Sequence, residues 1–305
     1  MKTLDVGDFD AALRQHRDAG WRPVTIRPAD DPAEVVLESP DGDRLMLRRT
    51  PLSISRADDD TAWHTGRAGV AYRDLIPDRW DGRYVASHIA VPAGGRLADD
   101  VHFHHVDFQF LAVRRGWVDV EYEGWGERLR MEVGDVVLQP PGIRHQVIEA
   151  SPGFEIVEVG SPADHLTEFD PATTLPDRRS PADRTWGGQR FVFSTARDRT
   201  TDSWDHPGFI AADTGIGAAT GGRVEVLMVD ADPQRLAATR PARSLRFIFV
   251  MDGEVTVTLD DAAPIRLGPG DAITIPADSR ELVSDPSADC RLLDVTTPAG
   301  VSLAA

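Results

Sequence analysis

Three histidines and a glutamine are the residues whose types and spacing could do chemistry. His102 and His104 are two positions apart, so on a β-strand both imidazoles project from the same face and can reach one point. Gln109 follows five positions after His104, and His145 comes after the turn sequence of residues 140–142. Neutral imidazole is a ligand for zinc, iron, nickel and copper. The two-residue spacing therefore makes His102 and His104 candidate ligands of one divalent metal ion.

Strands must position these residues, because apolar and polar residues alternate along much of the chain. The alternation is clear over 118–122 and 129–133, and it returns over 255–259 and 265–267. Glycines and prolines interrupt these segments at short intervals, which is typical of a sandwich or barrel of short strands. We therefore expect an all-β protein.

The N-terminal region carries a different pattern. Asp8 is placed to cap a helix whose apolar face faces a core, and Gly20 is placed to end that helix. Two strand-like runs, 35–37 and 45–47, then flank a Pro-Asp-Gly turn and predict a hairpin.

The two alternating regions repeat one another. Gly116 recurs as Gly253 at an offset of 137, and Gly134 recurs as Gly270 at an offset of 136. Each of the latter two is followed by Asp. Matches in the same order at nearly one offset indicate an internal duplication.

The second copy lacks the ligand set of the first. The same offsets place Thr239 and Pro241 where the first copy has His102 and His104. They place Arg246 at the position of Gln109 and Glu281 at the position of His145. We therefore expect the second copy to bind no metal, and a partly buried pair of Arg246 and Glu281 to form in its place.

The first histidine segment resembles the first motif of the cupin superfamily. That motif runs His, any residue, His, three or four residues, Glu or Gln, six residues, Gly. Here His102 and His104 are followed after four residues by Gln109 and after six more by Gly116. The opening glycine of the motif departs from the pattern, since Gly95 lies one residue early.

The second histidine segment resembles the second cupin motif, which runs Gly, five residues, Pro, any residue, Gly, two residues, His. Gly134, the turn at 140–142 and His145 fit it at every position. The resemblance is strong over about 70–160, while the second copy, about 205–298, resembles a cupin in its glycines and strands.

The resemblance implies an all-β fold of two double-stranded β-helix (jelly-roll) barrels with an N-terminal helix and hairpin extension. The expected domains are an extension over 1–64, a metal-binding barrel over 65–165, a linker over 166–204 and a degenerate barrel over 205–305. The degenerate barrel would serve packing or dimerisation, so a homodimer is a candidate assembly.

The resemblance implies that His102, His104 and His145 bind one divalent metal ion, with Gln109 as a fourth ligand. This ligand set implies unusual metal chemistry. Most cupins place a carboxylate where this chain has Gln109, so the double charge of the ion would be uncompensated, which favours an anionic substrate ligand. Gln109 would act in catalysis as a switchable ligand or as a hydrogen-bond donor to dioxygen. His88, on a strand expected over 83–91, is a candidate acid–base or substrate group, with a satisfied core histidine as the alternative.

The family resemblance favours Fe(II) as the ion and leaves Zn, Ni and Mn open. The leading interpretation is a non-heme iron dioxygenase acting on a small metal-chelating organic substrate. One alternative is a non-redox isomerase or lyase that uses the metal as a Lewis acid. The other is a non-catalytic, pirin-like ligand-binding cupin, and the fold alone does not choose among them.

Composition limits the partners. Acidic residues outnumber basic ones by 50 to 33, the net charge is −17, and Lys2 is the only lysine. Nucleic acids and anionic membranes are therefore poor partners, and a small molecule is expected. The polar N-terminal residues and the absence of a long apolar run predict a cytoplasmic protein. Cys290, the single cysteine, excludes an intramolecular disulfide.

Overall fold

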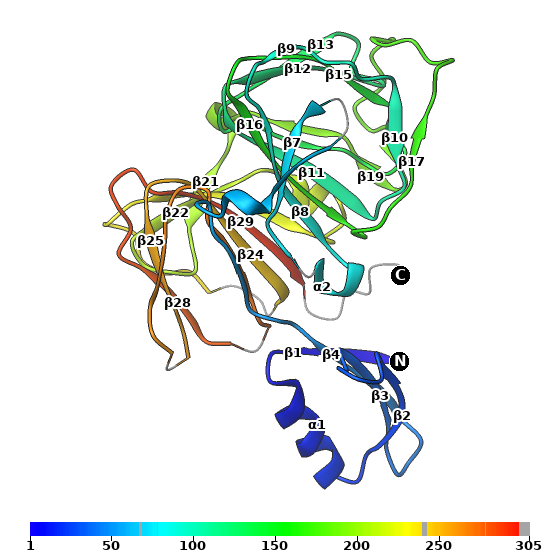
Figure 1. The fold of residues 1–305 in the computed structure, drawn as a ribbon, viewed down its shortest axis with the longest axis vertical. Coiled ribbons are helices and arrows are strands. Elements are labelled where there is room, and N and C mark those ends of the chain that lie inside the picture. The colour runs from blue at the N-terminus through cyan, green and yellow to red at the C-terminus, as the bar shows by residue number, and fades with distance from the viewer. Residues whose placement is uncertain (67–68, 78, 240–242, 261, 278, 299–305) are drawn as a thin grey trace. The chain divides into compact units, whose positions relative to one another are not determined.

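In the computed structural model the chain is almost entirely β-structure, which confirms the expected fold class (Figure 1). The structure describes residues 1–298 except 67–68, 78, 240–242, 261 and 278. Its α-helices are short: α1 (Phe9–Asp18), α2 (Arg79–Gly82) and α3 (Ile216–Ala219). Among the described residues, no helix has both the length and the apolar character needed to cross a membrane.

The N-terminal helix and hairpin form as the sequence predicts. The Asp8 side chain accepts a hydrogen bond from the backbone N–H of Ala11 at 2.8 Å and so caps α1. Gly20, with φ of +89°, follows the helix in the left-handed conformation that a side chain disfavours. The adjoining sheet has the order β1 (Lys2–Val6), β4 (Arg44–Arg49), β3 (Glu34–Glu38), β2 (Arg22–Arg27), and β3 and β4 form the predicted hairpin.

The described residues divide into two compact units. The first comprises Met1–Ile54, Ser203–Ile210 and residues 229–298, and the second comprises Ser55–Asp202 and Ala211–Met228. The two-barrel arrangement and the boundaries expected after residues 64, 165 and 204 stay predictions.

The second unit contains two sheets with an apolar core between them. The core draws side chains from both sheets, among them Val113 and Ile156 from one and Val120 and Met131 from the other. The larger sheet has the order β20 (Val192–Ser194), β14 (Val136–Leu138), β11 (Phe108–Arg115), β16 (Phe154–Ser161), β8 (Val85–Val91), β7 (Ala71–Asp74), β6 (Trp63–Thr65). The smaller has the order β13 (Arg128–Glu132), β12 (Trp117–Tyr122), β15 (His145–Ala150), β10 (His102–His104), β17 (Thr167–Phe169), with β9 (Gly95–Arg96) also paired to β15.

The segment expected as a linker supplies strands to these sheets. β17 pairs with β10, and the two lie side by side in Figure 1. β20 pairs with β14, and β18 (Thr185–Trp186) pairs with β19 (Gln189–Arg190). The pairing of β17 places Thr167 opposite His104, so this segment takes part in building the site.

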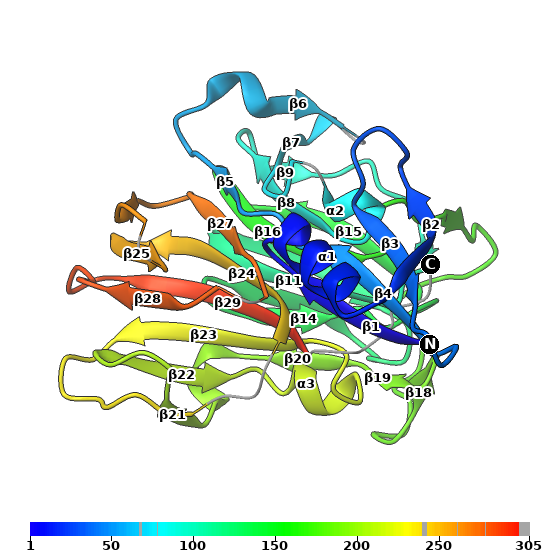
Figure 2. The same cartoon turned by 90° about the horizontal axis from the view of Figure 1, so that it is seen from below.

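Two further sheets carry the repeat. The longer has the order β21 (Thr201–Ser203), β22 (Phe209–Asp213), β23 (Glu225–Ala231), β29 (Arg291–Pro298), β24 (Arg243–Asp252), β27 (Ala272–Ile275), β5 (Ser53–Ser55). The shorter has the order β26 (Ile265–Leu267), β25 (Val255–Leu259), β28 (Glu281–Ser284). Figure 2 shows β22, β23, β29 and β24 side by side.

Candidate metal centre

Two neighbouring antiparallel strands supply all three histidines. His102 and His104 lie at the two ends of β10, with Phe103 between them, so both side chains project from one face. His145 is the first residue of β15 and pairs directly with His102. The cross-strand pair and the two-residue spacing together bring the three imidazoles to one place.

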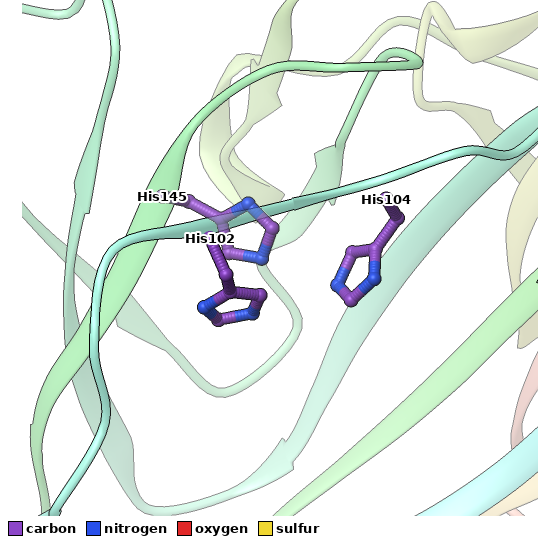
Figure 3. A group of neighbouring side chains, drawn as sticks. All are labelled: His102, His104 and His145. Carbon is purple, nitrogen blue, oxygen red and sulfur yellow. The ribbon is translucent and has the colours of Figure 1, made fainter. Parts of the chain in front are cut away.

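The three imidazoles lie close enough to share one ion. One ring nitrogen from each forms a set in which all members lie within 4.8 Å of one another. The ring centroids are 4.3 Å apart for His102 and His145 and 5.1 Å apart for the other two pairs. Figure 3 shows the rings of His102 and His145 side by side, with that of His104 facing them. His102 and His145 are buried, and His104 is partly buried.

Each imidazole is oriented through its Nδ1 atom. The Nδ1 of His102 donates to the Asp100 carbonyl at 2.7 Å, and that of His145 donates to the Ile143 carbonyl at 3.1 Å. The Nδ1 of His104 lies 2.8 Å from the Thr167 hydroxyl. Protonation at Nδ1 leaves the lone pair of a neutral imidazole on Nε2, and this is the usual arrangement for histidines that bind a metal. The three side chains therefore fit a divalent ion.

Gln109 lies on β11, and its amide orientation is fixed. Its Nε2 donates to the Glu158 carboxylate on the neighbouring strand β16. A carboxylate only accepts hydrogen bonds, so Nε2 rather than Oε1 must face Glu158. The Oε1 atom of Gln109 is buried and has no hydrogen-bond partner. An unsatisfied buried carbonyl oxygen is consistent with the expected ligand role, which stays a prediction.

The histidines line one wall of a cavity of about 380 Å³ inside the second unit. Glu158, Tyr122, Gln139, Asp99 and His165 line it as well, together with many apolar side chains. Burial raises the pKa of the Tyr122 hydroxyl, so Tyr122 stays protonated. Its oxygen accepts a hydrogen bond from the Gln139 amide at 2.8 Å, which leaves the phenolic proton to donate within the cavity.

His88 does not reach this cavity. The cavity takes Val85, Ile89 and Val91 from β8, and His88 projects from the opposite face of that strand. Its Nε2 lies 3.0 Å from the Glu155 carboxylate, which also accepts from Arg114. Burial lowers the pKa of His88, although Glu155 opposes this shift. The structure thus places His88 in a buried polar cluster away from the three histidines.

In the first unit, an arginine takes the corresponding place. Arg246 is fully buried, and its guanidinium donates to Asp205, Glu281 and Asp294 at 2.5–3.0 Å. This confirms the expected pair of Arg246 and Glu281. Asp205, His206 and Glu281 also have the proximity of a metal-binding group, but the guanidinium already contributes a positive charge among them. Thr239 is not among these partners, and Pro241 lies outside the described residues.

Comparison with known families decides the fold. Residues 238–290, in the second copy of the repeat, match the family model of the EutQ-like cupin domain. The chain has a cupin fold. A comparison with curated proteins found no match.

Solved structures show the same fold for this chain at low sequence identity. A putative glyoxylate-induced protein from Pseudomonas aeruginosa has a TM-score of 0.59 and 11% identity, covering 82% of this chain and 90% of its own. The HEPD of Streptomyces albus, solved with 2-hydroxyethylphosphonate and Fe(II), has a TM-score of 0.58 and 14% identity, covering 82% and 77%. An oxalate decarboxylase mutant from Bacillus subtilis has a TM-score of 0.56 and 13% identity, covering 83% and 78%. These likenesses concern the fold.

Several residues of the cupin cavity gave no clear sequence signal. Tyr122 ends the alternating run that starts at Val118, and it stacks on His145 with ring centroids 5.7 Å apart. Glu158 is two positions after Ile156 and faces the cavity with it. This inward position can be recognised only when it is known which face of the strand points to the core. A charged residue in an otherwise apolar inward row is the signal that would have identified Glu158.

Proposed function

We propose that this cupin is a metal-dependent enzyme that acts on a small, metal-chelating organic substrate bound in the 380 Å³ cavity. The observation that carries the proposal is the convergence of three imidazoles, each fixed through Nδ1, on the wall of that cavity. His102, His104 and His145 would hold the ion. Gln109 would add a weak neutral ligand through its unsatisfied Oε1.

The proposed reaction is an oxygenation with Fe(II) as the ion. A bound Fe(II) would supply redox chemistry with dioxygen and a Lewis-acidic point for a chelating substrate. Three neutral imidazoles suit Fe(II) and also Zn and Ni, and Mn is kept as an alternative although it prefers oxygen ligands. HEPD, a solved structure with this fold, has Fe(II) bound, and the oxalate decarboxylase of Bacillus subtilis has Mn(II) centres, which supports a redox-active ion.

Protein groups at the polar end of the cavity have defined roles in this proposal. Glu158 would accept a proton from the substrate as the substrate binds as an anion, while the Tyr122 hydroxyl would donate a hydrogen bond to the bound anion. Gln139 fixes that hydroxyl by donating to its oxygen. The surrounding apolar side chains exclude water, which strengthens both interactions.

A second candidate function is a non-redox isomerisation or elimination. The specific observation that favours it is Glu158, a carboxylate in the same cavity as the candidate metal ligands. A general base beside a Lewis acid is sufficient to form an enolate from a chelated carbonyl compound. Oxygen consumption separates the two candidates, because only the oxygenation uses dioxygen.

Metal analysis of the purified protein under air-free handling tests whether the three histidines bind a metal ion. We expect close to one iron per chain in the parent protein and loss of iron in His145→Ala. His105→Ala is the matched control, because His105 neighbours the ligands but is exposed and paired with Glu168. Absence of bound metal in the parent, even after incubation with Fe, Zn, Ni and Mn salts, would contradict the proposal.

Oxygen uptake with catechols, enols and thiols tests whether the reaction is an oxygenation. Uptake that requires both the substrate and the three histidines supports the oxygenase. Turnover without uptake, accompanied by exchange of a substrate C–H proton with solvent deuterium, would favour the isomerase or lyase. If a compound binds at the metal but no compound is turned over, a non-catalytic binding cupin is favoured.

A further inference from the structure

The cavity changes from polar to apolar along three of the strands that line it, β12, β15 and β16. β12 presents Tyr122 and then Val120 and Val118, while β15 presents His145 and then Val147. Inward-facing residues on a strand are two positions apart, so each step moves about 7 Å along the wall. The strand register aligns these steps, because Tyr122 pairs with His145 and Val120 pairs with Val147.

The larger sheet repeats this gradient. β16 presents Glu158, then Ile156, then Phe154, and the register pairs Ile156 with Ile89 and Phe154 with Val91 on β8. The cavity therefore has one end that carries the histidines, Tyr122 and Glu158. Apart from Asp99, whose carboxylate accepts a hydrogen bond from the Val147 N–H, the remainder is walled mainly by aliphatic and aromatic side chains. It extends for two strand steps, about 13 Å, away from the histidines.

The lining residues include acidic, amide, hydroxyl and imidazole groups, but no arginine and no lysine among the residues that the structure describes. A second anionic group on a substrate would have to leave water for an apolar wall without a positive partner. Burial of an unpaired charge is strongly unfavourable. The volume of about 380 Å³ lies near the lower end of the range for ligand pockets.

We propose that the substrate is a small amphipathic molecule with a single metal-chelating head and an uncharged apolar body. The head would bind at the three histidines, and the body would lie against Val120, Val147 and Ile156. This inference rests on the proposed metal site and deepens it, since it excludes dianionic substrates and very short ones that leave the apolar end empty.

A series of alkyl hydroxamates tests the inference by binding rather than by activity. The hydroxamate head chelates the metal, and the tail grows from acetohydroxamate to octanohydroxamate. With protein loaded to one Zn(II) per chain, calorimetry should show the affinity rising about fourfold per methylene until the apolar end is filled. The monohydroxamate of suberic acid matches octanohydroxamate in length but ends in a carboxylate, and we expect it to bind at least tenfold more weakly.

A substitution in the apolar end of the cavity tests where the alkyl tail of the hydroxamate binds. Val120→Phe places a larger side chain in the apolar end, so it should weaken octanohydroxamate at least tenfold while leaving acetohydroxamate within about twofold. Unchanged acetohydroxamate binding shows that the metal end is intact. If the variant does not fold, the chain-length series on the parent protein decides the matter alone.

The failures of the two proposals are distinguishable. A protein that takes up no metal contradicts the metal site itself. A protein that binds metal and acetohydroxamate, but whose affinity does not rise with tail length, overturns only the amphipathic substrate. Equal binding of octanohydroxamate and the suberic monohydroxamate would overturn it as well.

Discussion

Arg246 donates two hydrogen bonds, each 3.0 Å long, to the two carboxylate oxygens of Asp294. In the register of the sheets, Arg246 on β24 corresponds to Gln109 on β11, and Asp294 on β29 corresponds to Glu158 on β16. Both copies of the repeat thus keep a donor on one strand and a carboxylate on its neighbour. The first copy has three histidines in addition to this pair, and the second copy has carboxylates that surround the guanidinium of Arg246.

Substitution of Arg246 should destabilise the protein strongly. Arg246→Met would leave the buried Asp294 without its arginine, while Asp205 and Glu281 would keep only Arg243. Breaking a buried ion pair costs about 3–5 kcal/mol. Urea unfolding followed by circular dichroism measures the loss. Arg266→Met is the control, because its pair with Glu254 is exposed and should contribute less than about 1 kcal/mol. Equal effects of the two substitutions would contradict the assigned role of Arg246.

His206 should make stability depend on pH. Burial and the nearby Arg246 lower the pKa of His206 from 6.5 to about 4. Its Nδ1 also accepts a hydrogen bond from the Val283 N–H, which a protonated ring could not do. Between about pH 6.5 and 4 the unfolded chain binds a proton that the folded chain does not. The stabilisation is therefore complete above pH 6.5 and is lost as the pH falls towards 4.

The size of this loss is up to about 3 kcal/mol, from the linkage between a pKa shift and stability. Unfolding free energies measured between pH 7.5 and 4 in the parent protein, His206→Gln and the exposed control His105→Gln check it. His206→Gln should show a flatter profile than the other two. Three parallel profiles would show that His206 does not cause the dependence.

Glu158 should be required for turnover and dispensable for metal uptake. Glu158→Gln keeps the shape of the side chain but removes the proton acceptor from the cavity, and loss of a general base lowers rates by about 100-fold or more. Metal content should stay near that of the parent, since the three histidines are untouched. Glu149→Gln, at an exposed position on β15, is the control and should behave like the parent. A Glu158→Gln protein that has lost its metal would instead make Glu158 a ligand.

Thr167 should tune the metal affinity. Its hydroxyl lies 2.8 Å from Nδ1 of His104 and holds that ring in position. Thr167→Val keeps the shape and removes the hydrogen bond, and changes of this kind weaken metal binding by about 10–100-fold. Competition with a chromophoric chelator measures the affinity, with the exposed Thr201→Val as the control. Unchanged affinity would mean that packing alone orients His104.

Local spacing predicted that His102 and His104 share one face of a strand, and the resemblance to the second cupin motif added His145. Two positions on one strand and the first position of its neighbour define a point in space, whatever the rest of the chain does. The exchange of the second ligand set for Arg246 and Glu281 was predictable for a related reason, since a repeat preserves register. The helix and hairpin at the N-terminus carry their own start, stop and turn signals.

Strand phase was the information that the sequence lacked. On β8, His88 and Ser87 are both buried, so burial and polarity do not tell which row faces the cavity. On β16, Glu155 and Glu158 project from opposite faces, and only the register with β11 and β8 shows that Glu158 points inward. Leu111, Val147 and Ile156 line the cavity, but each has an apolar neighbour in its strand, so alternation alone did not fix their phase either.

The direct pairing of His102 with His145 has a consequence for folding. A slip of one residue between β10 and β15 would turn one imidazole to the opposite face of the sheet and dismantle the ligand set. Only chains that have paired these strands correctly could then retain an ion. The metal content of a preparation would therefore set a lower limit on the fraction of molecules in which this sheet is correctly paired.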